Sequence, residues 1–372
     1  MNFSVNKNEF FNNLQIADHA ISSNSPQPTL RGILISAKDG QLTLTGSDAD
    51  ISIQKIMKAD EKNQLNISEE GSILIDAQYL MQIVKKLDSE IINIEIIDGS
   101  LTKFSGASVV FKINGMNTDD YPTIDFSKPM NSIKMDASVL SDIIDQTAFA
   151  TSLKETRPVL TGVNFNLNEN QLNCTATDSY RLAKKTIEFK SDVSFNITIP
   201  AKSLNEVRGT VLMSTKEIEI AQNDKKAQFW SEDMVLQTRL LDGGYPETER
   251  LIPSEFSYTM KISREDLIHA IDRTTFIKND NMTINRLQCS SEEVILTNKS
   301  QEIGESHENL SAVFTGEPLD ISFSGTYVMD AAKALRGSEI IIKFTGEMKP
   351  FILSCDEDPT ILQLVLPVRT YN

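Results

Sequence analysis

The sequence predicts an α+β fold of three repeated domains, each with two helices packed on an antiparallel sheet. The first observation behind this prediction is a repeat at a shift of 124 residues, one third of the 372-residue chain. Ile75 to Leu80 aligns without gaps with Ile199 to Leu204 and with Phe323 to Val328. A period of this length is the size of a whole domain rather than of a solenoid unit. Three like domains suggest an arc or a ring, and duplication without functional meaning is the alternative.

The second observation is that each unit opens with a short strand and an amphipathic helix. The openings align after small insertions at Val5 to Phe10, Met135 to Leu140 and Ile262 to Leu267. In the second unit, apolar positions recur at helical spacing and form one stripe: Val139, Leu140, Ile143, Ile144, Thr147 and Ala148. Ser138 stands near the start of this helix, where a hydroxyl can cap free N–H groups.

The third observation is a series of short strands. Asp39-Gly40 separates two apolar runs and predicts a hairpin, and the polar turn Asn168 to Asn170 does the same in the second unit. At the shift of 124 residues, Ile94 falls opposite Ile218 and Ile342, and Ile96 falls opposite Ile220 and Phe344. One set does not fit, because Ile92 and Ile340 face Lys216.

A second helix is predicted in each unit, at Ala77 to Leu87, Ala201 to Arg208 and Tyr327 to Arg336. With about eight strands per unit, the helices are expected on one side of the sheet. Tyr121-Pro122 matches Tyr245-Pro246, and the proline-bounded stretches Pro122 to Pro129 and Pro246 to Pro253 are predicted linkers. The expected domains are 1–126, 127–253 and 254–372.

The composition narrows the class of protein. No apolar run reaches the ~18 residues of a membrane span, and the N-terminus lacks a signal segment. Cys174, Cys289 and Cys355 are too few and too widely spaced for a disulfide framework or a metal cluster. We therefore expect a cytoplasmic protein. Its net charge of -16 argues against tight nonspecific binding to nucleic acid.

The chain shows no convergent set of catalytic residues, so it is not expected to be an enzyme or to need a cofactor or metal. His19, His269 and His307 have no metal-ligand spacing, and phosphate-binding loops and nucleophile motifs are missing from the sequence. Asp48 and Asp178 occupy matching places after a strand. Metal ligation is one interpretation of this pair, but aspartate stabilises turns so readily that a turn role is favoured.

Basic residues on or near the predicted helices are candidates for a DNA-facing surface: Lys85, Lys86, Lys202, Arg208, Arg273, Lys278, Lys333 and Arg336. If these helices face inward in a ring, they would give an acidic body a mildly basic lining. Solvated helix faces, some of them favourable near a helix C-terminus, explain the same residues equally well.

Five motifs, in order along the whole chain, resemble the bacterial sliding clamp family, the beta subunits of DNA polymerase III. They are Arg157 to Gly162, Thr177 to Ala183, Tyr245-Pro246 followed by Arg250 to Pro253, Tyr327 to Asp330, and Leu366 to Tyr371. The resemblance implies three repeated clamp domains that form half of a ring. A head-to-tail homodimer of such arcs would encircle duplex DNA and tether the replicative polymerase. A topological hold needs only weak phosphate contacts, which the charge of -16 permits.

The resemblance also implies a pocket for short peptides of the polymerase, the clamp loader and other replication and repair proteins. Carried over by motif, its residues would be Leu160, Thr177, Ser179, Tyr180, Arg181, Leu182, Pro246, Arg250, Leu251, Met348, Pro350, Leu364, Leu366, Pro367, Val368 and Arg369. This apolar set with a few polar groups suits an extended peptide. Leu160, Leu182 and Leu366 could equally be core residues.

For the dimer interface, the residues that match the family's contact positions are Phe111, Phe276 and Ile277. The family often has a basic residue before the first Pro-Thr-Leu, whereas Ser22 to Gln27 has none, and the tail runs past Arg369 to Asn372. The leading hypothesis is a non-enzymatic DNA clamp. The alternatives are an acidic scaffold that never encircles DNA and a metal-dependent hydrolase using Asp48 and Asp178.

Overall fold

The computed structural model describes residues 1–278 and 282–369, without the side chain of Ser214. The tail after Arg369, from Thr370 to Asn372, lies outside the described residues. The chain forms two compact units. One comprises Met1–Leu140 with Lys202–Leu240, and the other comprises Ser141–Ala201 with Leu241–Asn372. The first repeat lies in the first unit and the third in the second, while the second repeat contributes to both.

The first unit contains two antiparallel sheets. The five-stranded sheet has the order β5 (Asn66–Glu69), β1 (Asn2–Asn6), β7 (Ile91–Asp98), β8 (Leu101–Ser105) and β9 (Val110–Asn114). The eight-stranded sheet has the order β10 (Asn131–Asp136), β15 (Glu217–Gln222), β16 (Lys226–Trp230), β17 (Met234–Arg239), β4 (Ile51–Lys58), β3 (Gln41–Ser47), β2 (Gly32–Lys38) and β6 (Gly71–Asp76). Because β17 pairs with β4, this sheet joins the second repeat to the first.

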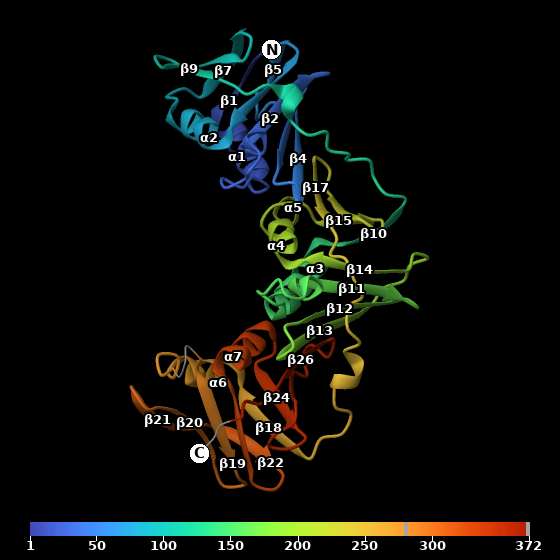
Figure 1. The fold of residues 1–372 in the computed structure, drawn as a ribbon, viewed down its shortest axis with the longest axis vertical. Helices are drawn as coiled ribbons and strands as arrows, with labels where there is room; N and C mark the ends of the chain where they lie inside the picture. Colours follow the sequence, from blue (N-terminus) through green and yellow to red (C-terminus); the bar gives the residue numbers. More distant parts are fainter. Residues whose placement is uncertain (279–281, 370–372) are drawn as a thin grey trace. The chain divides into compact units, whose positions relative to one another are not determined.

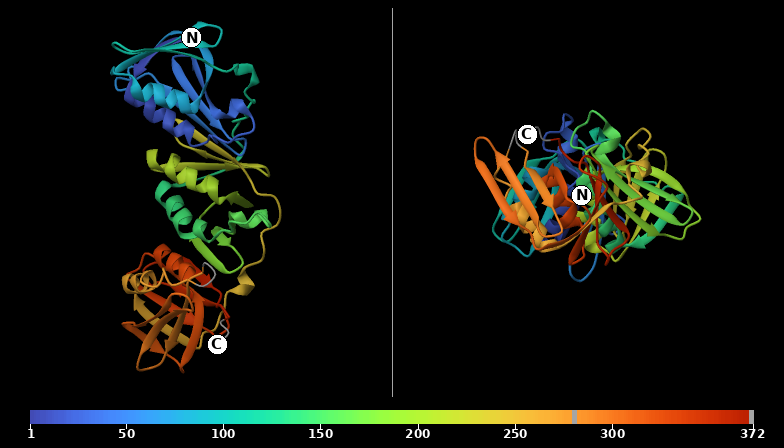
Figure 2. Two further views of the ribbon diagram at one scale, coloured as in Figure 1. Left: turned by 60° about the vertical axis from the view of Figure 1, so that its left-hand side comes forward. Right: turned by 90° about the horizontal axis from the view of Figure 1, so that it is seen from below.

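Helices α1 (Lys7–Asp18) and α2 (Ala77–Lys86) lie side by side against the strands of the first repeat (Figures 1 and 2). The side chains of Asn6 and Asp76 cap them by accepting hydrogen bonds from free backbone N–H groups. Phe10 and Leu14 of α1 and Leu80 of α2 are buried in one core with apolar residues from both sheets. The amphipathic pattern predicted for the first helix of the repeat is therefore confirmed, and the predicted second helix is present.

The second unit also contains two antiparallel sheets. The nine-stranded sheet has the order β14 (Phe195–Pro200), β11 (Gly162–Asn168), β12 (Gln171–Thr177), β13 (Arg181–Glu188), β26 (Ile361–Val365), β25 (Phe351–Ser354), β24 (Glu339–Phe344), β18 (Tyr258–Ser263) and β22 (Ala312–Thr315). The four-stranded sheet has the order β21 (Gly304–Asn309), β20 (Val294–Ser300), β19 (Ile284–Cys289) and β23 (Leu319–Ser324). Helices α6 (Arg264–Asp272) and α7 (Gly325–Ala334) pack together in the third repeat (Figure 1).

The second repeat supplies α3 (Ala137–Thr147), α4 (Ala201–Gly209) and the short α5 (Val211–Ser214). Single 3-10 turns complete the described chain: η1 (Pro28–Arg31), η2 (Thr118–Asp120), η3 (Ala148–Ala150), η4 (Pro158–Thr161) and η5 (Glu249–Leu251). Among the described residues, no helix combines the length and apolar character that a membrane crossing needs. The predicted α+β class, with two main helices per repeat and antiparallel sheet, is confirmed.

Both predicted hairpins are present. Asp39 and Gly40 have φ values of 51° and 72°, as the tight turn between β2 and β3 requires. Glu169 and Asn170 have φ values of 50° and 62° between β11 and β12. The local turn chemistry was therefore sufficient to predict strand pairing.

For the strand after the second helix, the predicted alignment of the second repeat was wrong by two residues, whereas the first and third repeats align as predicted. Val5 pairs with Ile92, Met135 with Ile218, and Ile262 with Ile340, so these three isoleucines are equivalent and all are buried. Helix α5 has no counterpart in the other repeats and lengthens the connection to β15 by two residues. Lys216 is exposed and precedes β15, so it is not the counterpart of Ile92 or Ile340.

Candidate functional site

Many of the residues predicted to line a peptide pocket lie where strands from two repeats pair. β13 of the second repeat runs antiparallel to β26 of the third, with Arg181 opposite Val365 and Leu182 opposite Leu364. The nine-stranded sheet is therefore continuous across this boundary. Main-chain pairing brings the Thr177 to Ala183 motif beside the C-terminal motif, although they are far apart in the sequence.

The turn between β12 and β13 is organised by Asp178. Its Oδ1 accepts hydrogen bonds from the backbone N of Tyr180 at 2.9 Å and of Arg181 at 3.0 Å. The Thr177 hydroxyl donates to Arg181 O at 2.6 Å and accepts from Ser179 N at 3.1 Å. These bonds hold Ser179 at a left-handed φ of 79°.

Asp48 organises the matching turn of the first repeat. Its Oδ1 accepts hydrogen bonds from Asp50 N at 3.0 Å and Ile51 N at 2.8 Å, and Ala49 also has a φ of 79°. The turn role favoured for the two aspartates is confirmed. No group of three or more His, Cys, Asp or Glu side chains in the described ranges is arranged to hold a metal.

Arg181 is enclosed by the second and third repeats. Its Nε donates to Asp178 Oδ2 at 3.1 Å, Nη1 to Asp330 Oδ2 at 2.7 Å, and Nη2 to Phe149 O at 2.7 Å. Its guanidinium carbon lies 4.5 Å from the ring centroid of Tyr327 and 5.3 Å from that of Phe149. Each guanidinium nitrogen already donates within the chain, and the side chain is 13% exposed. Arg181 therefore braces the turn against α7.

A small apolar cluster lies beside these Arg181 contacts, which we call the Arg181 clamp. Leu182, Ile352 and Leu364 are buried in it, and four partly buried side chains pack against them: Ile252, Phe256, Leu362 and Leu366. Neighbours of Ile352 in β25, Phe351 and Leu353, belong instead to the core of the third repeat. Since successive strand residues face opposite sides, the cluster covers the other face of the sheet.

Four cluster residues were missed by sequence reasoning: Ile252, Phe256, Ile352 and Leu362. A usable signal was present in β25, because Phe351 to Leu353 is a continuous apolar run, which is typical of a strand covered on both faces. Ile252 lies in the predicted linker and Phe256 lies just after it, where an apolar residue has no periodic partner.

Three large apolar side chains are exposed among the predicted pocket residues: Tyr180 at 61%, Leu251 at 54% and Met348 at 52%. Tyr180 extends from the β12–β13 turn and Leu251 from η5, whereas Met348 lies between β24 and β25. Exposed aromatic and apolar residues beside a buried cluster are typical of a docking surface.

The remaining predicted residues surround this cluster unequally. After β26, Leu366 N donates to Tyr180 O at 2.9 Å and Val368 N donates to Ser322 O at 2.7 Å, with Pro367 half-buried and Arg369 exposed. Pro246 is half-buried, while Arg250 is exposed beside Glu247 at 3.4 Å. Leu160 is buried in η4, and Pro350 is half-buried before β25. Neither of the last two belongs to the apolar cluster.

A polar network ties the second repeat to the third beneath the sheet. The buried Lys185 donates to Asp358 Oδ2 at 2.8 Å, and Gln146 donates to the same oxygen at 3.3 Å and to Ala334 O at 3.2 Å. Burial opposes ionisation of Asp358, but hydrogen bonds from Lys185, Thr360 and Gln146 lower its pKa to about 2.

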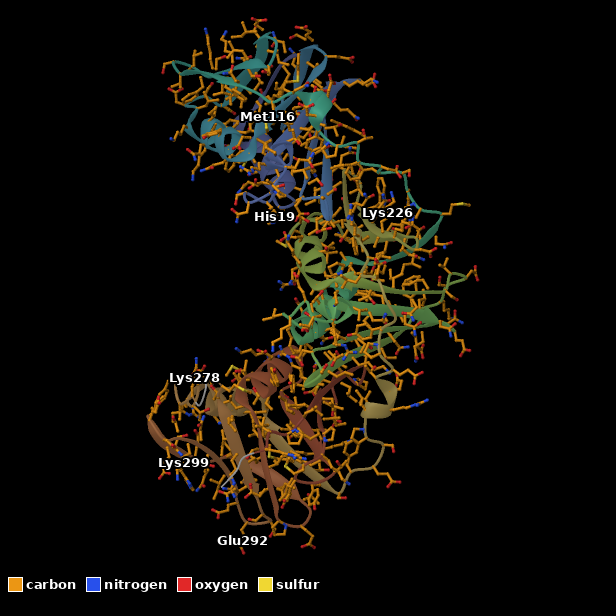
Figure 3. All side chains as sticks on the ribbon, in the orientation of Figure 1. His19, Met116, Lys226, Lys278, Glu292 and Lys299 are labelled. Atoms are coloured by element: carbon orange, nitrogen blue, oxygen red, sulfur yellow. The ribbon has the colours of Figure 1, made fainter. Side chains whose placement is uncertain are left out.

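The basic residues predicted to face DNA are all exposed, but half of them are engaged. Lys202 pairs with Asp48 at 2.8 Å, and bidentate pairs join Arg273 to Glu308 and Arg336 to Asp142. Arg208 also has a partner. Lys85, Lys86 and Lys333 form no ion pair within the described residues, and Lys278 lies at the end of a described range (Figure 3).

The three predicted interface residues differ in exposure. Phe276 is 66% exposed in the segment after α6, whereas its neighbour Ile277 is only 3% exposed. Phe111, on β9, is partly buried against the core of the first repeat. Ile277 is thus covered by its own repeat, and Phe276 is the side chain available to a partner.

Three family models match consecutive parts of the chain. They describe the N-terminal domain of the DNA polymerase III beta subunit at residues 1–125, its central domain at 134–247 and its C-terminal domain at 249–369. Together they cover most of the chain.

Curated relatives and solved structures agree with the family models. The beta sliding clamps of Bacillus subtilis and Staphylococcus aureus are each 36% identical over the full length of both chains. The B. subtilis clamp structure has a TM-score of 0.95 over 100% of both chains, and that of Streptococcus pneumoniae has 0.96 at 32% identity over 99% and 100%. The clamp of Bartonella birtlesii, 26% identical over both full chains with a TM-score of 0.93, was solved bound to griselimycin.

Proposed function

Because the chain belongs to the beta sliding clamp family, the beta subunits of DNA polymerase III, we propose that it is the processivity factor of a replicative DNA polymerase. Two copies would form a ring around duplex DNA and tether the polymerase through a peptide-binding pocket. The observation that carries the proposal is that all three domain models match the chain in order. Strand pairing also makes one continuous sheet across each of the two repeat boundaries. The domain bounds 1–126, 127–253 and 254–372 remain part of the proposal.

Two free strand edges support ring closure. In the described residues, β9 pairs only with β8, and β21 pairs only with β20. By repeat equivalence β9 corresponds to β17 and β26, and β21 corresponds to β4 and β13, which are the strands paired at the internal boundaries. A second copy of the chain can therefore continue the pattern head to tail, and the result closes as a symmetric dimer of six domains.

The internal pairings also predict the register of this dimer. Ile53 lies opposite Leu236, and Ala183 lies opposite Gln363. The equivalent pair is Ser306 with Phe111 of a second copy, because Phe104 pairs with Phe111 as Phe229 pairs with Leu236. The next pair along would join Glu305 to Lys112, whose opposite charges favour this register.

The charge distribution suits a clamp that slides. Of the basic residues predicted to face DNA, ion pairs occupy Lys202, Arg273 and Arg336, so phosphate contacts would be weak and easily exchanged. A ring retains DNA by topology, which the net charge of -16 does not oppose. We assign no catalytic step to the chain and expect it to work in the cytoplasm.

The pocket would receive a short extended peptide from the polymerase, the clamp loader or another replication and repair protein. The buried cluster of Leu182, Ile352 and Leu364 supplies its floor, and Tyr180 and Leu251 supply exposed anchors. The Arg181 clamp holds the turn that carries Tyr180. Apolar anchors with main-chain hydrogen bonds are the usual means of binding an extended peptide.

Retention on DNA tests the proposal. The labelled chain is loaded onto nicked circular DNA with a clamp loader and ATP, and the circle is then cut once. We expect the chain to stay on the circle and to leave the linear product. Retention on linear DNA would contradict the sliding mechanism, and failure to associate with the circle would favour the acidic scaffold.

A further inference from the structure

The third repeat carries a row of polar side chains where the other two repeats are apolar. Asn285 on β19 lies opposite Asn298 on β20, which lies opposite Ser306 on β21. The strand registers make these residues equivalent to one apolar row in each of the other repeats, namely Ile33, Gly46 and Ile53 in the first and Val163, Ala176 and Ala183 in the second. All six of those residues are buried.

Both asparagines donate to the segment that follows α6. Asn285 Nδ2 lies 2.9 Å from Thr274 Oγ1, and Asn298 Nδ2 lies 3.1 Å from Ile277 O and 3.4 Å from Thr274 O. The two amides are almost completely buried. They therefore fix the path of this segment from within the sheet.

Two hydroxyls extend the same support along the segment. Thr283 Oγ1 donates to Thr275 O at 3.3 Å, and Ser300 Oγ donates to Lys278 O at 2.9 Å (Lys278 is labelled in Figure 3). Thr283, Asn298 and Ser300 thus donate side-chain hydrogen bonds to four of the five carbonyls from Thr274 to Lys278. The residue whose carbonyl is left out is Phe276, which is 66% exposed.

This arrangement has an energetic cost that the other repeats avoid. The Oδ1 atoms of Asn285 and Asn298 and the Oγ of Ser306 are buried without a hydrogen-bond partner among the described residues. Buried unsatisfied oxygens destabilise a fold, whereas the apolar rows of the first two repeats carry no such groups. A local departure of this kind in a repeated fold indicates a local role.

The position of the segment identifies what it contacts. At each internal boundary, the end of the repeat's first helix contacts the next repeat: His19 Nδ1 lies 2.8 Å from Glu206 Oε2, and Gln146 donates to Ala334 O. The described residues contain no repeat after the third, so the end of α6 has no such neighbour among them. Arg273, at this end, pairs with Glu308 on the free edge strand β21, so the segment adjoins that edge.

We propose that Asn285 and Asn298 are positioning residues that pre-form the Thr274 to Lys278 segment and present Phe276 to a second copy of the chain. This inference rests on the proposed head-to-tail dimer and deepens it. An ordered segment does not have to lose conformational freedom when the copies meet, so the dimer forms with a smaller entropic cost. The middle repeat needs no such device, because its corresponding boundary is covalently continuous.

The experiment compares two buried asparagines in the full chain. Asn298→Asp keeps the shape of the side chain but removes its N–H donors. Asn164→Asp is the matched control, because Asn164 Nδ2 donates to Asn196 Oδ1, Thr198 Oγ1 and Ile197 O within β11 and β14, away from both free edges. Sedimentation equilibrium gives the dimer dissociation constant, and hydrogen exchange reports on the segment.

We expect Asn298→Asp to raise the dimer dissociation constant about tenfold and to speed exchange at the Ile277 amide, while Asn164→Asp leaves the constant unchanged. An unchanged constant in Asn298→Asp, or an equal rise in both variants, would overturn the positioning role. If Asn298→Asp does not fold, Asn298→Ala, which introduces the side chain of the second repeat, is judged by the same readouts. A wild-type chain that stays monomeric would overturn the dimer itself and this inference with it.

Discussion

The two internal boundaries between repeats share the same strand pairing but differ in the turn beside it. At the first boundary β4 pairs with β17, and at the second β13 pairs with β26. At each, a buried lysine forms an ion pair with an aspartate: Lys55 with Asp233 at the first, and Lys185 with Asp358 at the second. The turns beside them share the aspartate, Asp48 or Asp178, but differ at the three residues that follow it. Where the first boundary has the buried Ile51, the second has Arg181 with its acidic and aromatic clamp.

This difference explains why we place a docking pocket only at the second boundary. Ile51 is buried, and the turn before it consists of Asp48, Ala49 and Asp50, with no large apolar side chain. Arg181 instead anchors a turn that exposes Tyr180 above a buried apolar cluster. Strand pairing is thus common to both boundaries, whereas the Arg181 contacts and the exposed Tyr180, to which we assign peptide binding, are found at the second.

The largest contrast is expected from removing the buried lysines. Lys185→Met should destabilise its unit by about 3 kcal/mol, since it leaves the partly buried Asp358 without its cation. Lys55→Met should cost less, because the Asp233 side chain is 47% exposed and can rehydrate, against 20% for Asp358. Hydrogen exchange in denaturant, followed separately in each unit, measures both losses, because a chain of several domains does not unfold in one step. Equal losses would contradict the difference between the boundaries.

A smaller effect, about 2 kcal/mol in peptide affinity, is expected for Tyr180→Ala. Tyr79 on α2 is its control, because both tyrosines are 61% exposed. Calorimetry with a clamp-binding peptide should show the loss for Tyr180→Ala only, with thermal stability unchanged in both variants. A comparable loss for Tyr79→Ala would move the pocket away from the second boundary.

Arg181→Lys should weaken the same peptide by about tenfold. A lysine ammonium is a compact point charge and cannot bind Asp178, Asp330 and Phe149 O while stacking on Tyr327. The conservative Ile51→Val in the matching turn serves as the control and should leave peptide affinity unchanged. If the Arg181→Lys variant binds the peptide with unchanged affinity, the turn does not depend on the contacts of Arg181.

The smallest effect concerns two carboxyls, one near each boundary. Hydrogen bonds from Ser127 and Lys226 lower the pKa of Asp125 to about 2, and Asp358 also has a pKa of about 2. Both values lie below the ordinary 3.8, so the stabilisation is complete above that pH and is lost as the pH falls towards 2. Screening by about 1 M NaCl should raise the pKa of the exposed Asp125 more than that of Asp358. Carboxyl NMR titration with and without the salt measures both changes. Equal shifts would argue against burial of the Lys185–Asp358 pair.

Much of the repeat could be predicted from local pattern. Asp39-Gly40, the α3 stripe and the aspartate turns depend on neighbouring residues, so the sequence contains their signal. The two residues added by α5 displaced the predicted alignment of the second repeat. Because strand residues alternate with a period of two, a shift of two keeps apolar residues opposite apolar residues, and the only sign of it is the mismatch at Lys216. Local pattern also gave no sign that β13 would pair with β26, since such contacts join distant segments.

The candidate site was predictable to the extent that its motifs resemble a family. Tyr180, Leu182, Leu364 and Leu366 were found by motif and lie together around one cluster. Ile252 and Phe256 were missed because their partners come from other strands. The engagement of Arg181 could not be foreseen either, because Asp330 and Phe149 approach it only in the folded chain.

Hydrogen exchange with and without a polymerase-derived clamp-binding peptide tests most directly the claim that docking belongs to the second boundary alone. We predict slower exchange at Tyr180 to Leu182 and at Leu366 to Arg369, and no change at Asp48 to Ser52 in the matching turn of the first repeat. Protection at Asp48 to Ser52, or none at Tyr180 to Leu182, would contradict the account.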